Sequence, residues 1–593
     1  MLKKVLSLLD ARQKRQVAVM GLNMLMISVL EAIGIGAIIP LMTVLAEPKR
    51  IQSIGWLRRI YQVLNPSSYS QFVVYLALAM LGLVLIKNLV IGLSYRRQYR
   101  FAFNVQKTIS VRLLSAYLTV PYQYFLKRNT AELLKNIQGE VPVFVSFILI
   151  PGLMLVSEGV ITLTVLGLLL MVNATLTIMI SLFLTLGLAL IFYLVRRQTD
   201  RVGRQRKEAL SESYKIATKA LSSVKDIKVL GQQQAMADEY EAASRRYSES
   251  MAYQTTLSAM PRLTVEALAF IALITILLYS VENRTGVGDA LPLMALFAMA
   301  AVRLIPSFNR IFMSVLQLRY YTHTLNVIHH AFDEVRQMSG RAQSADAHPI
   351  SFCERIELRG VTYKYPGAEE PALRDVDLVI EKGRAIGLVG PSGSGKTTLV
   401  DLLLGLLGGY SGEIRVDGRL IDREAAVTWE HGIGYVPQQT YLSDDSVAAN
   451  VAFGMSPSDI DMEAVKRAVE VAQLSEFVAT LPNGLMTEIG ERGIRLSGGQ
   501  RQRVGIARAL YHNPEVLVMD EATSALDGLT EWEITSAIER LSGSKTLIVI
   551  AHRLTTVERC DTLYLLEGGR ITATGTYSQL AQHSAYFLKL TSK

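Results

Sequence analysis

A glycine-rich segment in the second half of the chain has the residue types of a phosphate-binding loop. Residues 390–397 read Gly-Pro-Ser-Gly-Ser-Gly-Lys-Thr and fit the pattern G-x-x-x-x-G-K-[ST] in full. A short apolar strand is predicted before it, at 385–389, and a helix directly after it. Backbone N–H groups of such a loop bind phosphate oxygens, Lys396 adds a positive charge, and Thr397 offers a hydroxyl to Mg²⁺. The segment therefore predicts a nucleoside triphosphate site.

Two acidic residues are candidates for binding Mg²⁺ and for activating the attacking water. The apolar run 516–519 predicts a buried strand, and Asp520 and Glu521 follow it directly. At the end of that strand, Asp520 is placed to hold Mg²⁺ through its hydration shell. Glu521 is placed to polarise the attacking water, which is the work of a general base. Together the two segments predict hydrolysis of the triphosphate.

The order of the motifs resembles that of the ABC ATPases. Residues 496–500 read Leu-Ser-Gly-Gly-Gln, the signature sequence of that family, and the resemblance extends over about 350–593. The motifs follow the family's order along the chain: Tyr365, the phosphate loop, Gln438, Glu491, the signature, Asp520 with Glu521, residues 524–527, and His552. The alternating strands and helices of this region fit the α/β P-loop fold that the resemblance implies.

The resemblance assigns a role to each motif residue. It implies that Tyr365 stacks on adenine, that Gln438 reaches Mg²⁺ and the membrane part, and that His552 contacts the γ-phosphate. The predicted catalytic residues are Glu521, His552 and Gln438, and the predicted metal ligands are Thr397, Gln438 and Asp520. The predicted nucleotide-binding residues are Tyr365, Gly390, Ser392, Gly393, Ser394, Gly395, Lys396, Thr397, Thr398, Ser497, Gly498, Gly499, Gln500 and Asp527.

A single set of motifs predicts a pair of chains. The resemblance implies that Ser497 and Gly499 cap the γ-phosphate of an ATP held by another subunit. A second helix N-terminus would close the open side of the triphosphate and add hydrogen-bond donors there. One loop and one signature do not face each other within one domain, so we predict a two-fold homodimer with two shared ATP sites.

The first half of the chain has the composition of a membrane domain. Of the 593 residues, 50% are apolar and 19% are charged, and the mean hydropathy is +0.28. Apolar runs of roughly 20 residues, long enough to cross a bilayer, all lie before about residue 320. We predict six spans near 17–46, 71–95, 143–170, 174–195, 262–282 and 287–317. The predicted domains are a helical transmembrane domain at 1–320, a linker at 321–349 and a nucleotide-binding domain at 350–593.

The net charge of +9 is explained by basic residues placed as in the cytoplasmic loops of a membrane protein. Basic residues cluster after the second and fourth spans, in the long helical stretches 96–140 and 196–257, as in cytoplasmic loops. This favours a cytoplasmic location for these extensions and argues against nucleic-acid binding. Cys353 and Cys560 lack metal-ligand spacing and are typical of a reduced compartment. The first apolar run is too long for a cleavable signal peptide, so we expect it to remain as a span.

Charged residues inside the predicted spans point to a substrate path. The bases are Lys87, Arg262, Arg303 and Arg310, and the acids are Glu31, Glu158 and Glu266. Such charges are costly in a membrane and usually face a cavity or a partner. Arg303 and Arg310 are two helical turns apart, and a basic stripe there would suit an anionic head group such as a pyrophosphate. The alternative is that they pair with Glu31 or Glu158 and stabilise the packing of the helices.

The membrane part resembles that of exporter half-transporters of the bacterial cytoplasmic membrane. Residues 121–133 and 221–231 match segments that hold short coupling helices in this family. Residues 30–40 and 301–311, with an amphipathic segment near Trp56, resemble the lipid-linked oligosaccharide flippases of protein N-glycosylation. This implies export of an undecaprenyl-pyrophosphate-linked glycan from the inner to the outer leaflet.

Other functions fit the sequence to different degrees. A lipid A, phospholipid or multidrug exporter is the alternative within the same class. The soluble ABC ATPases of DNA repair and translation lack membrane spans, and an ATP-regulated channel would not need both Glu521 and His552. Only about 16 residues precede the first span, which argues against a bacteriocin exporter with a leading peptidase domain.

Overall fold

The structure is a computed structural model that describes residues 2–46, 55–282, 287–339, 352–430, 432–490, 493–520, 543–550, 556–584 and 587. The chain divides into two compact units. The helical unit comprises residues 1–118 and 130–335, and the ATPase unit comprises residues 119–129 and 336–593.

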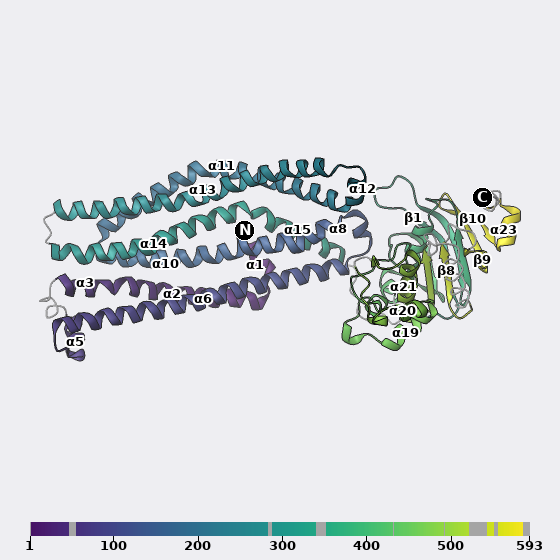
Figure 1. Ribbon diagram of the computed structural model, residues 1–593, viewed down its shortest axis with the longest axis horizontal. Coiled ribbons are helices and arrows are strands. Elements are labelled where there is room, and N and C mark those ends of the chain that lie inside the picture. Colours follow the sequence, from purple (N-terminus) through teal and green to yellow (C-terminus); the bar gives the residue numbers. More distant parts are fainter. Residues whose placement is uncertain are drawn as a thin grey trace. The chain divides into compact units, whose positions relative to one another are not determined.

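The long helices of the helical unit run alongside one another, and shorter helices join or flank them (Figure 1). They are α1 (Leu2–Leu8), α2 (Ala11–Gly36), α3 (Ile38–Ala46), α5 (Gly55–Leu64), α6 (Tyr69–Thr119), α8 (Thr130–Lys135), α9 (Val141–Phe144), α10 (Ile150–Val172), α11 (Ala174–Ser222), α12 (Val224–Val229), α13 (Gln233–Glu282), α14 (Val287–Tyr320) and α15 (Thr322–Ser339). Two π-helical turns, Asn136–Glu140 and Val145–Leu149, flank α9.

Four stretches of the described helices are long and apolar enough to cross a membrane. They are Ala11–Leu45, Tyr69–Thr119, Glu132–Val172 and Met294–Tyr320, which contain or overlap the predicted spans one, two, three and six. The fourth and fifth predicted spans fall in α11 and α13, where many side chains lie outside the described residues. On α6, Leu81, Leu85 and Leu89 keep more than half of their surface exposed, as expected of a face that meets lipid.

The core of the helical unit lies between α2, α10 and α14. On α10, Ile161, Val165 and Leu169 recur every four residues and are buried, because side chains four apart share one face of a helix. They pack in one cluster with Ile27 of α2 and Leu304 of α14. This packing fixes the rotation of the three helices about their axes, and therefore decides which polar side chains meet between them.

The amphipathic segment predicted near Trp56 is the helix α5. Its Arg58 and Arg59 are exposed, whereas Leu57 is fully buried with Val44 and Phe72. The apolar side of α5 therefore packs on the protein, against α3 and α6, and its arginines point away from that contact.

A helix occupies the first part of the range predicted as a linker. Leu325, Ile328, Ala331 and Val335 of α15 are buried, and the helical unit extends to Val335. The N-terminal helix α1 contacts α15, since the Lys4 ammonium donates to Asn326 Oδ1 at 2.7 Å. The helical unit therefore extends beyond residue 320, while residues 340–349 lie outside the described residues.

The ATPase unit contains two sheets. The strands are β1 (Arg355–Tyr363), β2 (Leu373–Glu381), β3 (Ala385–Val389), β4 (Ser411–Val416), β5 (Arg419–Leu420), β6 (Ile433–Val436), β7 (Val516–Asp520), β8 (Thr546–Ile550), β9 (Thr562–Glu567) and β10 (Arg570–Gly575). The larger sheet has the order β10-β9-β3-β8-β7-β6, in which all but β10 are parallel. The smaller sheet is antiparallel, with the order β2-β1-β4-β5.

Helices cover the larger sheet. They are α16 (Lys396–Leu403), α17 (Arg423–Glu430), α18 (Val447–Val451), α19 (Met462–Val471), α20 (Ser475–Thr480), α21 (Gly498–Leu510) and α23 (Tyr577–His583), and α7 (Gln123–Lys127) belongs to the same unit. In β7, Val516 and Val518 enter one apolar cluster, whereas Leu517 and Met519 enter the other. Because successive side chains of a strand point to opposite faces, a continuous apolar run is buried on both sides.

Candidate nucleotide site and membrane charge network

The phosphate loop joins β3 to α16 and depends on three glycines. Gly390, Gly393 and Gly395 have φ angles of 152°, 78° and 104°, which favour glycine over other residues. A Cβ atom on Gly390 would lie 2.1 Å from the carbonyl oxygen of Leu566, and one on Gly395 would lie 2.8 Å from that of Ala372. The spacing of glycines that identified the loop is therefore required by its backbone.

The loop holds its own lysine. Lys396 Nζ donates to the carbonyl oxygens of Gly390 and Pro391, at 2.7 and 2.9 Å, and the side chain is buried. The two threonines that follow differ in exposure. Thr397 is exposed, so its hydroxyl is accessible to a bound ion, whereas Thr398 is buried and its hydroxyl lies 3.1 Å from the hydroxyl of Tyr365.

Parallel strands bring the other predicted residues to the same edge of the sheet. Leu388 of β3 and Asp520 of β7 both pair with Ile550 of β8, so the three lie in one row at the carboxyl ends of the strands. Gln438 follows β6, the next strand, by two residues and is exposed. Ligands of open α/β sheets bind at this edge. Glu521, Asp527, His552 and Glu491 lie outside the described residues.

Two residues that the sequence analysis did not select share this edge. Burial and the nearby Asp520 raise the pKa of Asp401, on α16, to about 6. Burial, with the charges of Asp520 and Asp401, also raises the pKa of Tyr435 on β6. Asp401 interrupts the apolar run 399–403, and that interruption was the only signal in the sequence. The edge is therefore rich in negative charge and favours binding of a cation.

The signature segment begins a helix. Ser497 Oγ accepts from the backbone N–H of Gln500 at 3.2 Å, and Gln500 Oε1 accepts from the N–H of Ser497 at 2.8 Å. This reciprocal capping box explains why Ser and Gln stand three residues apart. The hydroxyl of Ser497 accepts in this contact, so its own hydrogen remains able to donate. Ser497 is exposed at the N-terminus of α21, where the helix dipole favours an anion.

The residues present fit ATP with Mg²⁺. Ser394 Oγ is buried in the loop and has no hydrogen-bond partner among the described residues, and space is open around Gly393. Thr397, Asp520 and Gln438 offer oxygen ligands, which Mg²⁺ prefers. Few protein ligands suffice, because Mg²⁺ usually takes the rest from phosphates and water.

The predicted bases of the membrane spans meet buried acids. Glu31 on α2 and Glu158 on α10 are 3% and 2% exposed. Arg303 donates to Glu31 at 2.8 Å and to Glu158 at 3.2 Å. Lys87 on α6 donates to Glu31 at 2.8 Å, and Arg310 donates to Glu158. The pairing considered as an alternative in the sequence is thus the arrangement found. The side chain of Arg262 lies outside the described residues.

The two arginines differ in exposure. The side chain of Arg303 is 17% exposed and also donates to Ser307 Oγ at 2.5 Å. The side chain of Arg310 is 42% exposed and donates to the hydroxyl of Tyr95 at 2.8 Å. Three cations and two carboxylates give this membrane charge network, Lys87, Glu31, Arg303, Glu158 and Arg310, one excess positive charge. The excess is accessible at Arg310.

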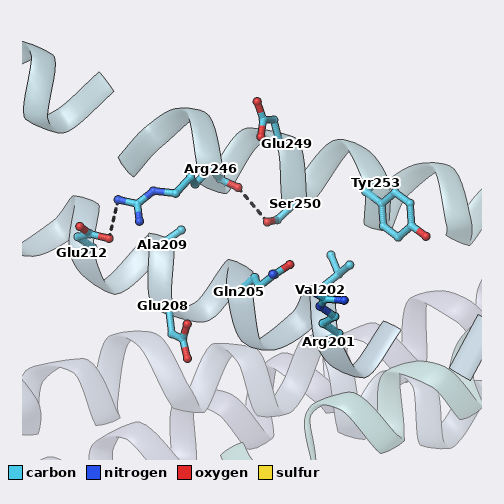
Figure 2. Close-up of a pocket in the computed structure, with 10 residues that line it drawn as sticks. All are labelled: Arg201, Val202, Gln205, Glu208, Ala209, Glu212, Arg246, Glu249, Ser250 and Tyr253. Atoms are coloured by element: carbon cyan, nitrogen blue, oxygen red, sulfur yellow. Dashed lines mark hydrogen bonds and ion pairs between the residues drawn. The ribbon is translucent and has the colours of Figure 1, made fainter. Parts of the chain in front are cut away.

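A separate groove lies between α11 and α13 and has a volume of about 710 Å³ (Figure 2). It is lined by Arg201, Val202, Gln205, Glu208, Ala209, Glu212, Arg246, Glu249, Ser250 and Tyr253. Arg246 spans its rim and donates to Glu212 at 2.9 Å. Lys87, Arg303 and Arg310 are not among its lining residues, so the groove and the membrane charge network are different features.

Comparison with known proteins places both units in one family. Residues 3–302 match the family described as "ABC transporter transmembrane region", and residues 373–524 match the family described as "ABC transporter". The first match alone covers half of the chain. The chain therefore belongs to the ABC transporter family.

Within the ABC transporter family, the relatives of this chain are exporters. The chain is 29% identical over 521 residues to the ATP-dependent lipid A-core flippase of Burkholderia orbicola, covering 87% of this chain and 86% of that protein. It is 30% identical over 519 residues to the flippase of the same name from Cupriavidus metallidurans, covering 86% of each. A bacterial Atm1-family ABC exporter with ATP bound has the same fold, with a TM-score of 0.74, 22% identity, and coverage of 98% of this chain and 99% of that one.

The chain is therefore an ABC exporter that hydrolyses ATP, a multi-pass protein of the bacterial inner membrane with its ATPase domain in the cytoplasm. The predicted fold class, a helical membrane domain fused to an α/β ATPase domain, is confirmed. The predicted ATPase activity and membrane location are confirmed as well. The relatives favour the lipid A alternative over the oligosaccharide flippase of N-glycosylation.

Proposed function

We propose that this exporter moves an anionic lipid of the lipid A class from the inner to the outer leaflet, at the expense of ATP. The observation that carries the proposal is the alignment over both units, covering 86–87% of this chain, with proteins named lipid A-core flippases. A pyrophosphate-linked oligosaccharide lipid is the second candidate, because residues 30–40 and 301–311 resemble its flippases. Both cargoes carry phosphate groups on a lipid, so both need an accessible cation.

We further propose that Arg310 is the contact for that anionic head group. Arg303 is fully engaged with Glu31, Glu158 and Ser307, so we assign it a structural role. Arg310 is more exposed and shares Glu158 with Arg303, which leaves the network with excess positive charge at that end. Arginine binds phosphate through several N–H groups at once.

For the ATPase cycle, we propose the following roles in each chain. The loop N–H groups and Lys396 bind the phosphates, and Thr397, Asp520 and Gln438 hold Mg²⁺, which neutralises charge on the phosphates when bound. Glu521 accepts a proton from the attacking water, and His552 contacts the γ-phosphate. Ser497 donates from the N-terminus of α21 to the ATP of the partner chain.

Transport in proteoliposomes tests the cargo. Purified protein would be reconstituted with fluorescent lipid A or with an undecaprenyl-pyrophosphate-linked glycan, and outward movement measured with and without ATP. We expect ATP-dependent flipping of lipid A, and none in Glu521→Gln. Flipping of the glycan lipid alone would reject the first candidate in favour of the second, and flipping of neither would reject both.

Disulfide trapping tests the homodimer. Cysteines introduced at Ser392 and Ser497 should cross-link between chains when ATP is trapped by Glu521→Gln, because the exposed loop and the exposed signature would share one nucleotide. Non-reducing electrophoresis of differently tagged chains distinguishes links between chains from links within one. Links only within a chain would contradict the shared site.

A further inference from the structure

The short helix α7 belongs to the ATPase unit although it follows the membrane helix α6 in the chain. Residues 119–129 cluster with residues 336–593. Within that unit, the side-chain amide of Gln123 donates to the carbonyl oxygen of Gly408 at 2.5 Å and to the hydroxyl of Tyr363 at 3.3 Å. Gln123 therefore uses both N–H groups of its amide to join the loop after α16 to the end of β1.

Tyr363 in turn supports Tyr365. Tyr363 is 2% exposed, and its ring meets that of Tyr365 edge to face, with centroids 5.0 Å apart and an angle of 83° between the planes. The hydroxyl of Tyr365 is held at 3.1 Å from Thr398 Oγ1, on the helix that begins at the phosphate loop. The Tyr365 ring is thus fixed at two points, its edge contact with Tyr363 and its hydroxyl.

We propose that Gln123 is a positioning residue for the nucleotide base. The inference rests on the proposed function only in taking Tyr365 as the ring on which adenine stacks. A stacking platform binds well only if its plane is fixed before the base arrives, because ordering it on binding costs entropy. Gln123 anchors the Tyr363 hydroxyl, and Tyr363 holds the Tyr365 ring by its edge. The affinity for the base therefore depends on a residue of α7.

The contact between Gln123 and Tyr363 matters because of where Gln123 lies in the chain. α7 lies between α6, which ends at Thr119, and α8, which begins at Thr130 in the helical unit. A displacement of α7 that breaks the Gln123–Tyr363 contact would loosen the adenine platform and leave the phosphate loop unchanged. The structure thus links the segment between two helices of the membrane part to affinity for the base.

The test compares a ligand that has a base with one that has none. KM for ATP and kcat would be measured on the full-length protein in lipid nanodiscs, together with the inhibition constant of inorganic tripolyphosphate, which occupies only the phosphate loop. Tyr363→Phe removes the hydroxyl and keeps the ring, and Gln123→Met removes both donors at nearly constant volume and adds no acceptor for the Tyr363 hydroxyl. Lys127→Ala, on the exposed side of the same helix, is the matched control.

We expect KM for ATP to rise about three- to tenfold in Gln123→Met, and by less in Tyr363→Phe, since edge-to-face ring pairs contribute free energies of this order. The inhibition constant of tripolyphosphate should stay within twofold of the parent, and Lys127→Ala should resemble the parent throughout. The double variant should be no worse than Gln123→Met alone, because both changes break the contact between Gln123 and Tyr363.

Several results would overturn the inference. One is an unchanged KM for ATP in both variants, and another is an additive effect in the double variant. A loss of tripolyphosphate affinity equal to the loss of ATP affinity would also overturn it. Tyr365→Ala separates the two levels of the argument: if it leaves KM for ATP unchanged, the assignment of Tyr365 to adenine fails. If Tyr365→Ala raises KM but Tyr363→Phe and Gln123→Met do not, only the role of Gln123 fails. Should Gln123→Met fail to fold, Tyr363→Phe decides alone, because it preserves the buried ring.

Discussion

The phosphate loop and the membrane charge network both bury basic side chains, but they position them differently. Lys396 bonds to carbonyl oxygens of Gly390 and Pro391, six and five residues before it. Arg303 bonds to Glu31 and Glu158, 272 and 145 residues away in the chain, on two other helices. One arrangement is built by local backbone geometry and the other by the packing of whole helices. The two should respond to different perturbations.

The largest expected effect is confined to the ATPase unit. Glu521→Gln should lower ATP turnover by at least about a hundredfold, because the attacking water loses its base. ATP binding should persist, since Lys396 and the loop are untouched, and the melting temperature should stay that of the parent. Turnover by phosphate release, together with binding of a fluorescent ATP analogue, checks both. Hydrolysis above about a tenth of the parent rate would remove Glu521 from this role.

This contrast explains what could be read from the sequence. The phosphate loop, the signature and Asp520 occupy contiguous segments whose backbone conformation follows from their own residues, so their types and spacing predict them. The seven-residue spacing of Arg303 and Arg310 predicted a common face, and both reach Glu158.

The sequence named Glu31 and Glu158 as partners of those arginines, but it could not decide whether the pairs form. Whether these side chains meet depends on the rotation of α2, α10 and α14 about their axes. Packing of side chains such as Val165 and Leu304 sets that rotation, and no local pattern records it. Gln123 was missed for the same reason, because its partners Tyr363 and Gly408 lie far along the chain.

The second prediction separates the two arginines of the network. Arg303→Ala leaves Glu31 and Glu158 buried with fewer partners, so we expect a loss of about 3–5 kcal/mol and poor yield of folded protein. Arg310→Ala should cost less, about 1 kcal/mol, because solvent screens the more exposed Arg310 and Glu158 keeps Arg303 and Ser307. Melting temperatures in detergent measure both effects.

Transport by the same variants sharpens the comparison. Arg310→Ala should fold, hydrolyse ATP at the basal rate and flip lipid A at least tenfold more slowly. Arg310→Lys retains the charge and is the control, with partial transport expected. A stable Arg310→Ala protein that flips lipid A at the parent rate would contradict its assignment to the head group. Equal destabilisation by the two alanine variants would contradict the division of roles.

The third prediction concerns Asp401, which lies at the carboxyl edge of the larger sheet in the ATPase unit. Burial and Asp520 raise its pKa from the ordinary 3.8 to about 6, so the folded state binds its proton more readily than the unfolded state. The protonated Asp401 therefore contributes to the free energy of unfolding at low pH, and this contribution is lost as the pH rises through about 6. Asp401→Asn, which mimics the protonated form, should stabilise the nucleotide-free protein at pH 7.5 by about 1 kcal/mol after allowance for solvent screening.

The measurement is the difference in melting temperature between Asp401→Asn and the parent across the pH range. The difference should be largest at pH 7.5 and should shrink towards pH 5, where the parent carboxyl is itself protonated. A difference that grows on acidification would show that Asp401 is stabilised as a carboxylate.

The smallest expected effect comes from Gly34, which makes room for one cation of the network. A Cβ atom there would lie 3.3 Å from Cδ of Lys87, whose ammonium reaches Glu31, whereas a Cβ on Gly21 of the same helix would meet nothing within 4 Å. Both glycines gain helix propensity on replacement by alanine, about 0.5–1 kcal/mol. Gly21→Ala should therefore raise the melting temperature, while Gly34→Ala should not, because crowding of the Lys87 stem offsets the gain. Lys87→Ala removes that stem, and in this background the two glycine variants should gain equally. If Gly34→Ala matches Gly21→Ala with Lys87 present, the side chain of Lys87 adjusts freely and Gly34 has no part in positioning the network.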